Sequence, residues 1–215
     1  MYDITTAEQW HKFRKEGIGG SDAAAIMGLS PYKTNQQLCA EKRGLVKAKN
    51  IDDKPYVIYG KKIEQYIRGI YSLDFPQHDV FYKEFDVCVH PQYPFIRATL
   101  DGRVIAEKRV LEVKKAEIKN GGQMAEWKDQ VPYNYFIQVL HQLLASGYEC
   151  ATLAADLITG EGLKRRHDIR YYHFERKDYL EDLATLLEEE VKFWNTYVLP
   201  HNVDLMIMPQ KLPVI

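Results

Sequence analysis

Two carboxylates and one lysine lie close together in the middle of the chain, at Asp101, Glu112 and Lys114. Residues 110–114 alternate like a short strand, which places Glu112 and Lys114 side by side on one face and their apolar neighbours on the other. Asp101 precedes Gly102 in a turn signal between two apolar runs. A hairpin or meander at this point can therefore bring Asp101 beside Glu112.

This group carries the side chains needed for metal-dependent phosphodiester hydrolysis. Two carboxylates offer the hard oxygen ligands that Mg²⁺ or Mn²⁺ prefers. A neighbouring lysine can hold or deprotonate an attacking water, or stabilise charge developing on a phosphate. The opposing interpretation is a solvated charge pair, because Glu-x-Lys also occurs at residues 117–119, 126–128, 175–177 and 190–192. The copy at Glu112 differs because apolar residues flank it in a strand pattern.

A glycine-rich segment, residues 17–27, follows a helix pattern at residues 6–14. Its glycines form a turn, and Ser21 or Asp22 is placed to cap the helix that follows. A glycine turn that enters a helix exposes backbone N–H groups suited to a phosphate, and Arg14 can add a charge-assisted contact. A tight turn into an ordinary packed helix is the simpler interpretation of the same residues, since glycine-rich helix starts are common.

The composition limits the class of protein. The chain has 215 residues, of which 46% are hydrophobic and 27% charged, with a formal net charge of −1. These values predict one soluble α/β or α+β domain over residues 1–215, and they neither require nor exclude a nucleic-acid partner. Three scattered cysteines favour a reducing, intracellular location over a disulfide framework. No apolar run has the length of a membrane span.

Hydrophobic periodicity predicts a sheet with helices packed on it. Strands are expected as an antiparallel run at residues 80–90, 95–100, 103–106 and 110–118, and further strands at 151–158 and 164–174. Helices are expected at residues 6–14, 34–43, 55–71, 133–146 and 178–199, besides the helix that follows the glycine turn. Glu64, in the helix at 55–71, is either exposed or a third carboxylate turned toward the site.

Three further features have two interpretations each. Gln138 lies beside the apolar face of the helix at 133–146, with Tyr135 about one turn before it, and it either reaches the site or is a satisfied buried amide. The basic strand at 164–174 either faces nucleic acid or is a sheet edge protected by charge. The apolar tail, residues 200–215, is expected to dock on the core or on another subunit.

Six short blocks occur in one order and are more specific together than any one alone. They are Trp10-His-Lys-Phe-Arg14, Gly17-Ile-Gly-Gly-Ser-Asp22, Gly60-Lys-Lys-Ile-Glu64, Leu100-Asp-Gly102, Leu111-Glu-Val-Lys114 and Tyr135-Phe-Ile-Gln138. From residue 10 to about residue 157 the sequence resembles the YqaJ-type viral recombinases, the family of phage lambda exonuclease within the PD-(D/E)-x-K nucleases. The resemblance implies a restriction-endonuclease-like core, with a central mixed β-sheet flanked by helices.

The resemblance also implies roles for individual residues. Asp101 and Glu112 would bind Mg²⁺ or Mn²⁺, and Lys114 would act on the nucleophilic water. Glu64 would support that water or a metal ion, and Gln138 would complete the catalytic signature. One departure is Leu100, which stands where the family has a proline that bears no ligand atom.

A second implied group binds DNA. Arg14 and Ser21 would hold the terminal 5′-phosphate, and Thr99 stands where a family serine often helps. Tyr135 would line the site.

The activity that the resemblance implies is 5′→3′ digestion of one strand of linear double-stranded DNA to mononucleotides, which leaves 3′ overhangs. Relatives form a ring-shaped homotrimer around DNA and act beside a single-strand annealing protein. This implies a phage or prophage protein in the cytoplasm of a bacterial host. Two alternatives remain: a restriction-like or structure-specific endonuclease with the same metal core, and a non-catalytic DNA-binding recombination protein.

Overall fold

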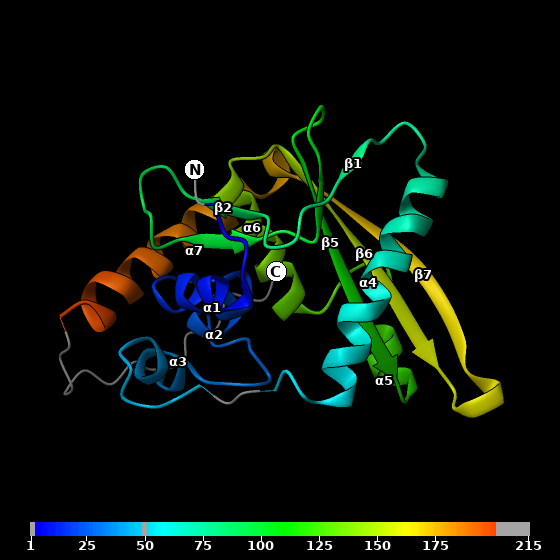
Figure 1. Ribbon diagram of the computed structural model, residues 1–215, viewed down its shortest axis with the longest axis horizontal. Helices are drawn as coiled ribbons and strands as arrows, with labels where there is room; N and C mark the ends of the chain where they lie inside the picture. Colours follow the sequence, from blue (N-terminus) through cyan, green and yellow to red (C-terminus); the bar gives the residue numbers. More distant parts are fainter. Residues whose placement is uncertain (1–2, 49–50, 201–215) are drawn as a thin grey trace.

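The computed structural model describes residues 3–48 and 51–200 (Figure 1). Its helices are α1 (Ala7–Lys15), α2 (Gly20–Ile26), α3 (Asn35–Lys42), α4 (Pro55–Asp74), α5 (Gly121–Ala125), α6 (Tyr133–Ser146) and α7 (Leu180–Lys192), with 3₁₀ turns η1 (Gly162–Lys164) and η2 (Arg176–Tyr179) and a π-helical turn η3 (Phe193–Val198). Its strands are β1 (Val80–Phe81), β2 (Val87–Val89), β3 (Arg97–Thr99), β4 (Gly102–Val104), β5 (Arg109–Ile118), β6 (Cys150–Thr159) and β7 (Arg166–Glu175). No helix within the described ranges is long and apolar enough to cross a membrane. Residues 201–215 lie outside these ranges, so docking of the tail stays a prediction.

Five strands form one sheet in the order β1-β4-β5-β6-β7. β5 and β6 are parallel, with Arg109 opposite Cys150 and Ile118 opposite Thr159, and the other neighbouring strands are antiparallel. α4 covers one face of the sheet, and α6 packs on the other face together with α2 (Figure 1). This central mixed sheet flanked by helices confirms the predicted fold class.

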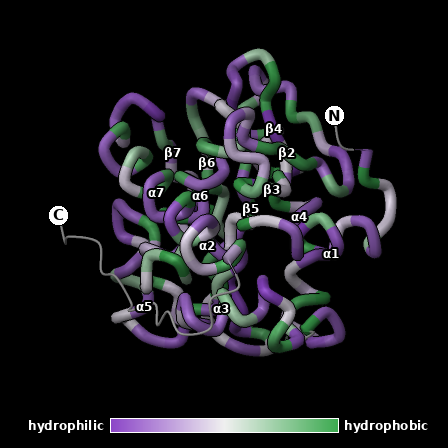
Figure 2. Tube along the Cα trace, turned by 90° about the vertical axis from the view of Figure 1, so that its left-hand side faces the viewer, coloured by the Kyte–Doolittle hydropathy of each residue, from purple (hydrophilic) through white to green (hydrophobic). Residues whose placement is uncertain are grey.

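The burial of β5 and β6 follows from their sequences. Every residue of β6 except the last is buried, as expected of a strand covered on both faces. In β5 the residues from Val110 to Val113 are all buried, and Leu111 and Val113 join the apolar cluster under α4, whereas Val110 joins the cluster of α6. Glu112 and Lys114 therefore face the α6 side, as the alternation predicts. Figure 2 shows hydrophobic positions along the sheet and α6, and hydrophilic positions in the outer loops.

A parallel pair of strands needs a crossover connection, and α5 and α6 supply it between β5 and β6. α6 coincides with the helix predicted at residues 133–146. Its buried apolar side chains are Ile137, Val139, Leu140, Leu143 and Leu144. Gly147 ends the helix with φ 66°, a left-handed conformation that glycine adopts without strain. This helix therefore has a fixed position over the sheet and can orient polar side chains on β5.

The prediction of one strand at residues 80–90 is wrong, because the structure divides it into β1 and β2. A turn interrupts the run: Phe85 has φ 56°, and the N–H of Asp86 donates to the carbonyl of Lys83 at 3.1 Å. β1 pairs with β4, whereas β2 pairs with β3 in a separate two-stranded sheet. The predicted antiparallel run is thus split over two sheets, which an ion pair between Asp86 and Arg103 joins at 2.9 Å.

The glycine segment after α1 runs alongside β3. The N–H of Ile18 donates to the carbonyl of Phe95 at 2.6 Å, and the N–H of Arg97 donates to the carbonyl of Ile18 at 2.9 Å. A Cβ atom at Gly17 would lie 2.5 Å from the Phe95 carbonyl oxygen. Glycine is required at this position because two backbones come into contact.

Replacement of Gly17 by alanine is expected to lower the free energy of unfolding by about 1–3 kcal/mol, because the new methyl group would overpack a backbone. Gly60 is the matched control: it lies inside α4, and a Cβ there would meet nothing within 4 Å. Gly60→Ala should raise the free energy of unfolding by about 0.5–1 kcal/mol through helix propensity. Urea unfolding measures the free energy of unfolding of both variants. Equal changes in the two variants would contradict the close approach of the Gly17 and Phe95 backbones.

Candidate active site

The short pairing of β4 creates an edge on β5 at which Asp101 lies. β4 pairs with β5 only from Gly102 to Val104, opposite the first residues of β5. Beyond that point Asp101 Oδ2 accepts a hydrogen bond from the N–H of Val113 at 2.9 Å. The carboxylate thus takes the place of a strand neighbour and lies beside the residues that flank Glu112. Arg68, on α4, donates to the Asp101 carbonyl at 3.2 Å and supports the same turn.

Three donors surround the carboxylate of Glu112, which is 1% exposed. Gln138 Nε2 donates to Glu112 Oε1 at 2.6 Å, and Gln142 Nε2 donates to Glu112 Oε2. The ammonium of Lys114 forms an ion pair with Oε1. The two glutamines stand one turn apart on α6 and hold the carboxylate from the same helix face. Sequence reasoning missed Gln142, although its i+4 spacing from Gln138 could have indicated it.

The charges in this group perturb one another. Burial raises the pKa of the Asp101 carboxyl well above its ordinary value, and the negative charge of Glu112 raises that pKa further. Burial also raises the pKa of Glu64, where Arg68 opposes the rise and Glu112 adds to it. For Lys114, burial alone would lower the pKa of the ammonium, but the charges of Glu112 and Asp101 outweigh burial and raise it. Lys114 is therefore a charged donor here.

Glu64 lies on the active-site side of α4. It is half-buried, and its pKa responds to both Glu112 and Lys114. Glu64 is therefore not fully exposed, and its role as a third carboxylate of the site stays a prediction.

The donor set fits a hard divalent cation in its chemistry. Asp101 and Glu112 supply carboxylate oxygens; burial raises the pKa of Asp101 and the charge of Glu112 raises it further, and a bound cation would offset both effects. Among residues 3–48 and 51–200, no three His, Cys, Asp or Glu side chains converge as a ready metal-binding group. Binding of a metal ion by Asp101 and Glu112 stays a prediction.

The residues predicted to hold a 5′-phosphate are linked to one another through Trp10. Arg14 Nη2 donates to Ser21 Oγ at 3.2 Å, and the Arg14 guanidinium lies 4.8 Å from the centre of the Trp10 ring. Trp10 Nε1 donates in turn to Thr99 Oγ1 at 2.9 Å. The structure therefore brings Arg14, Ser21 and Thr99 into one group from α1, α2 and β3. No pattern in the sequence indicates this link through Trp10.

The prediction that Ser21 or Asp22 caps α2 is wrong, because Gly19 is the N-cap. Asp22 instead accepts from the Gly19 N–H at 3.0 Å from inside the first turn. Its carboxylate also forms a buried ion pair with Lys42 at 2.6 Å. Burial raises the pKa of Asp22, but the charges of Lys42 and Arg14 outweigh burial and lower it. Lys42 also donates to the Arg14 carbonyl at 3.0 Å, so one ion pair fixes the ends of three helices.

Tyr135 lies with the carboxylate group rather than with Arg14 and Ser21. The Lys114 ammonium lies 5.5 Å from the centre of its ring. On the same helix, the side chain of Gln138 packs against the start of α2, where a Cβ at Gly20 would lie 3.0 Å from Gln138 Cγ. A small residue at position 20 thus leaves room for Gln138 to reach Glu112.

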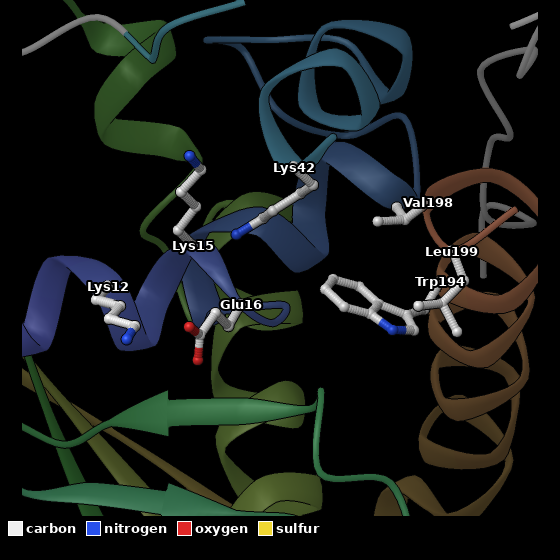
Figure 3. Close-up of a pocket in the computed structure, with 7 residues that line it drawn as sticks. All are labelled: Lys12, Lys15, Glu16, Lys42, Trp194, Val198 and Leu199. Atoms are coloured by element: carbon white, nitrogen blue, oxygen red, sulfur yellow. The ribbon is translucent and has the colours of Figure 1, made fainter. Parts of the chain in front are cut away.

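A pocket of about 490 Å³ lies apart from this site, between α1, α3 and η3 (Figure 3). Its lining residues are Lys12, Lys15, Glu16, Lys42, Trp194, Val198 and Leu199. It contains none of the residues predicted for the site. The Lys42 side chain connects it to Arg14 only through the carbonyl contact described above.

Solved structures with the same fold are exonucleases by description. The chain is similar to an alkaline exonuclease of Laribacter hongkongensis, with 18% identity, a TM-score of 0.66, and coverage of 89% of this chain and 92% of that one. It is also similar to a putative exonuclease of Eubacterium rectale, with 12% identity, a TM-score of 0.53, and coverage of 96% of both chains. At these identities the similarity establishes the fold, and it agrees with a restriction-endonuclease-like core.

Sequence comparison establishes the family. The chain is 29% identical over 205 residues to the uncharacterized protein YqaJ of Bacillus subtilis; the match covers 89% of this chain and 56% of that protein. The chain therefore spans little more than half the length of this relative. Residues 9–149 match the YqaJ-like viral recombinase domain. Because this match covers most of the sequence and both charged groups of the site, the chain belongs to the YqaJ-like viral recombinase domain family.

Proposed function

We propose that the protein is a metal-dependent 5′→3′ exonuclease that degrades one strand of linear double-stranded DNA to mononucleotides and leaves 3′ overhangs. The observation that carries this proposal is the convergence of Asp101, Glu112 and Lys114 at one edge of β5. Family membership and a fold shared with alkaline exonucleases support a nuclease acting on DNA. The Laribacter enzyme also has a structure in complex with dAMP, a mononucleotide.

In this proposal Asp101 and Glu112 hold Mg²⁺, or Mn²⁺ in its place. When bound, such an ion would stabilise charge on the phosphate and activate water as a nucleophile. The Lys114 ammonium donates hydrogen bonds to the attacking water or to a phosphate oxygen. Gln138 and Gln142 fix the orientation of Glu112 through their amide N–H groups. Glu64 orients the water from the α4 side.

The residues predicted to hold a 5′-phosphate select the end of the DNA strand in this proposal. Arg14 and Ser21 bind the terminal 5′-phosphate, with the Thr99 hydroxyl held nearby through Trp10. Binding the terminal phosphate at a fixed position places the next phosphodiester at the carboxylates. Tyr135, whose ring lies beside the Lys114 ammonium, lines the site on the side of the carboxylates. This arrangement accounts for release of one nucleotide at a time.

One incubation tests the activity. The protein is mixed with Mg²⁺ and a linear duplex that carries a 5′-phosphate and a label on one strand, and the shortened strand and the released product are identified. The expected result is loss of the 5′-phosphorylated strand as mononucleotides, abolished by EDTA. Cutting of a closed circular duplex would instead indicate the endonuclease alternative. Binding without any cleavage would indicate a non-catalytic recombination protein.

We also propose the partners that accompany this activity: double-stranded DNA ends, a single-strand annealing protein, and two further copies of the chain in a homotrimer in the cytoplasm of a bacterial host. The description of the family as viral recombinases supports a role in recombination. Light scattering of the purified protein, with and without duplex DNA, measures the number of subunits. A monomer under both conditions would contradict the trimer and leave the nuclease proposal intact.

Replacement of Arg14 by alanine is expected to reduce the preference for phosphorylated over unphosphorylated 5′ ends by about 10- to 100-fold, since one or two charge-assisted hydrogen bonds are lost. The preference is the ratio of kcat/KM for the two duplexes. Lys15→Ala is the matched control, because Lys15 carries a neighbouring charge on α1 and lines the separate pocket. An unchanged ratio in Arg14→Ala would remove Arg14 from phosphate binding.

A further inference from the structure

The turn between β6 and β7 presents a cluster of cations that the proposed site does not use. Lys164, Arg165 and Arg166 are consecutive and exposed. Within the described part of the chain, none of the three forms an ion pair with a carboxylate. We call this segment the basic tip. In Figure 1 it projects beyond the end of β6, at the lower right of the view.

An aromatic ring joins the basic tip to the neighbouring elements. The Arg165 guanidinium lies 4.9 Å from the centre of the Tyr59 ring on α4, and the Lys115 ammonium lies 5.3 Å from the same ring. Glu117 pairs with Lys115 at 2.7 Å, and Glu161 is a further exposed carboxylate in this region. Cations still outnumber carboxylates here, although the whole chain has a net charge of −1.

The ladder of the sheet fixes how far the basic tip lies from the site. Arg166 pairs with Thr159, which pairs with Ile118, four residues beyond Lys114 along β5. At about 3.3 Å per residue and about 4.8 Å per strand, Arg166 is about 13 Å along and about 10 Å across the sheet from Lys114. The separation is therefore about 16 Å, which corresponds to about five base pairs of duplex at 3.4 Å each.

We propose that the basic tip, with Tyr59 and Lys115 behind it, binds the phosphate backbone of the duplex about five base pairs from the point of cleavage. This proposal rests on the proposed function, because it takes the site at Lys114 as the place where a DNA end is held. The competing explanation is protection of a sheet edge, since β7 is an edge strand and exposed cations discourage pairing with another chain. Protection of the edge does not explain the cation–π contacts with Tyr59, because Tyr59 lies on α4 and not at the open edge of β7.

The test compares a double variant of the basic tip, Arg165→Ala with Arg166→Ala, with a control double variant, Lys83→Ala with Lys177→Ala. Lys177 follows the opposite end of β7, and Lys83 precedes β2, so both control lysines lie away from the tip. Binding is measured by fluorescence anisotropy in EDTA over a range of salt concentrations. Two labelled DNAs are used: a long duplex, and a loop-closed stem of fewer than about five base pairs that cannot reach the tip.

For the long duplex, the tip variant should lower the slope of log K against log salt by about two and raise Kd by about 10- to 100-fold at about 0.1 M salt. Kd for the short stem, and both values for the control variant, should stay within about twofold of the wild type. Unchanged binding of the long duplex, or equal weakening of both DNAs, would overturn the proposal. This binding assay does not depend on the proposed nuclease activity, because anisotropy in EDTA requires no cleavage. A wild-type protein that binds the duplex but does not cut it with Mg²⁺ would overturn the proposed activity and leave the binding result unaffected.

Discussion

Lys114→Ala should lower kcat for digestion of linear duplex DNA by about 10²- to 10⁴-fold, the range for loss of one positioned proton donor or electrostatic stabiliser. The reason is the position of the ammonium, which is paired with Glu112 and close enough to Asp101 for both carboxylates to raise its pKa. A charged group held at this place acts on the attacking water or on the phosphate, whereas methylene groups do not. Lys114→Met, which keeps the length of the side chain, should lose as much activity as Lys114→Ala.

Measurements of DNA binding and of folding show whether the Lys114 variants lose activity without losing the structure of the site. Both variants should bind a 5′-phosphorylated duplex within about tenfold of the wild type, because Arg14 and Ser21 are untouched. Circular dichroism and thermal unfolding in the presence of Mg²⁺ report whether the fold persists. Lys177→Ala serves as a control for the loss of a lysine far from the carboxylates. Near-normal turnover of a folded Lys114→Ala protein would exclude the proposed role of Lys114.

The part of the site that sequence predicts is the part encoded by local periodicity. Residues 110–114 alternate with period two, and the structure places Glu112 and Lys114 on one face of β5 as that period requires. The turn at Asp101 was equally readable, because Asp-Gly between apolar runs marks a reversal of the chain. α6 was predicted to the residue from its apolar face and its terminal glycine. These features depend on neighbours in the sequence.

What the sequence left open depends on contacts between distant segments. The break at Phe85 that separates β1 from β2 rests on a positive φ at a phenylalanine, which no residue pattern indicates. The bond from Trp10 to Thr99 joins residues 89 positions apart, and Gln142 meets Glu112 only because α6 returns over β5. Such pairs become visible once the register of the sheet and the position of α6 are fixed.

The largest effect on stability is expected at a buried pair between α6 and α7. His141 and Glu190 both have fully buried side chains, with His141 Nδ1 2.6 Å from Glu190 Oε1. His141 Nε2 lies 2.8 Å from the carbonyl oxygen of Arg97. Both ring nitrogens face oxygen atoms that can accept a hydrogen bond, an arrangement that favours the protonated imidazolium. This pair joins α6, α7 and β3, and His141 stands about one turn after Gln138.

Glu190→Leu should lower the free energy of unfolding by about 3–5 kcal/mol, because it removes the counter-charge of a buried imidazolium. His141→Leu should lower the free energy of unfolding by a similar amount, because it leaves the buried Glu190 carboxylate without its counter-charge. The Oε2 atom of Glu190 already has no hydrogen-bond partner within the described part of the chain. The double variant His141→Leu with Glu190→Leu should recover most of the loss, since apolar side chains can replace a complete buried pair at little cost. Urea unfolding of the singles and the double closes the cycle. Additive losses in the double variant would show that the two side chains do not act as a pair.

Because of His141, the free energy of unfolding is expected to fall as the pH rises. Burial lowers the pKa of His141. The charge of Glu190 and the hydrogen bonds to Glu190 and to the Arg97 carbonyl raise it by more, and the charge of Asp22 raises it further. The pKa of His141 in the folded protein therefore lies above the ordinary value of 6.5. A raised folded pKa means that the stabilisation is complete below about pH 6.5 and is lost as the pH rises through the folded value. The free energy of unfolding of the wild type should therefore fall above about pH 6.5 relative to that of the double leucine variant, which has no such group. Parallel pH profiles for the two proteins would mean that His141 does not gain a proton on folding and would contradict this prediction.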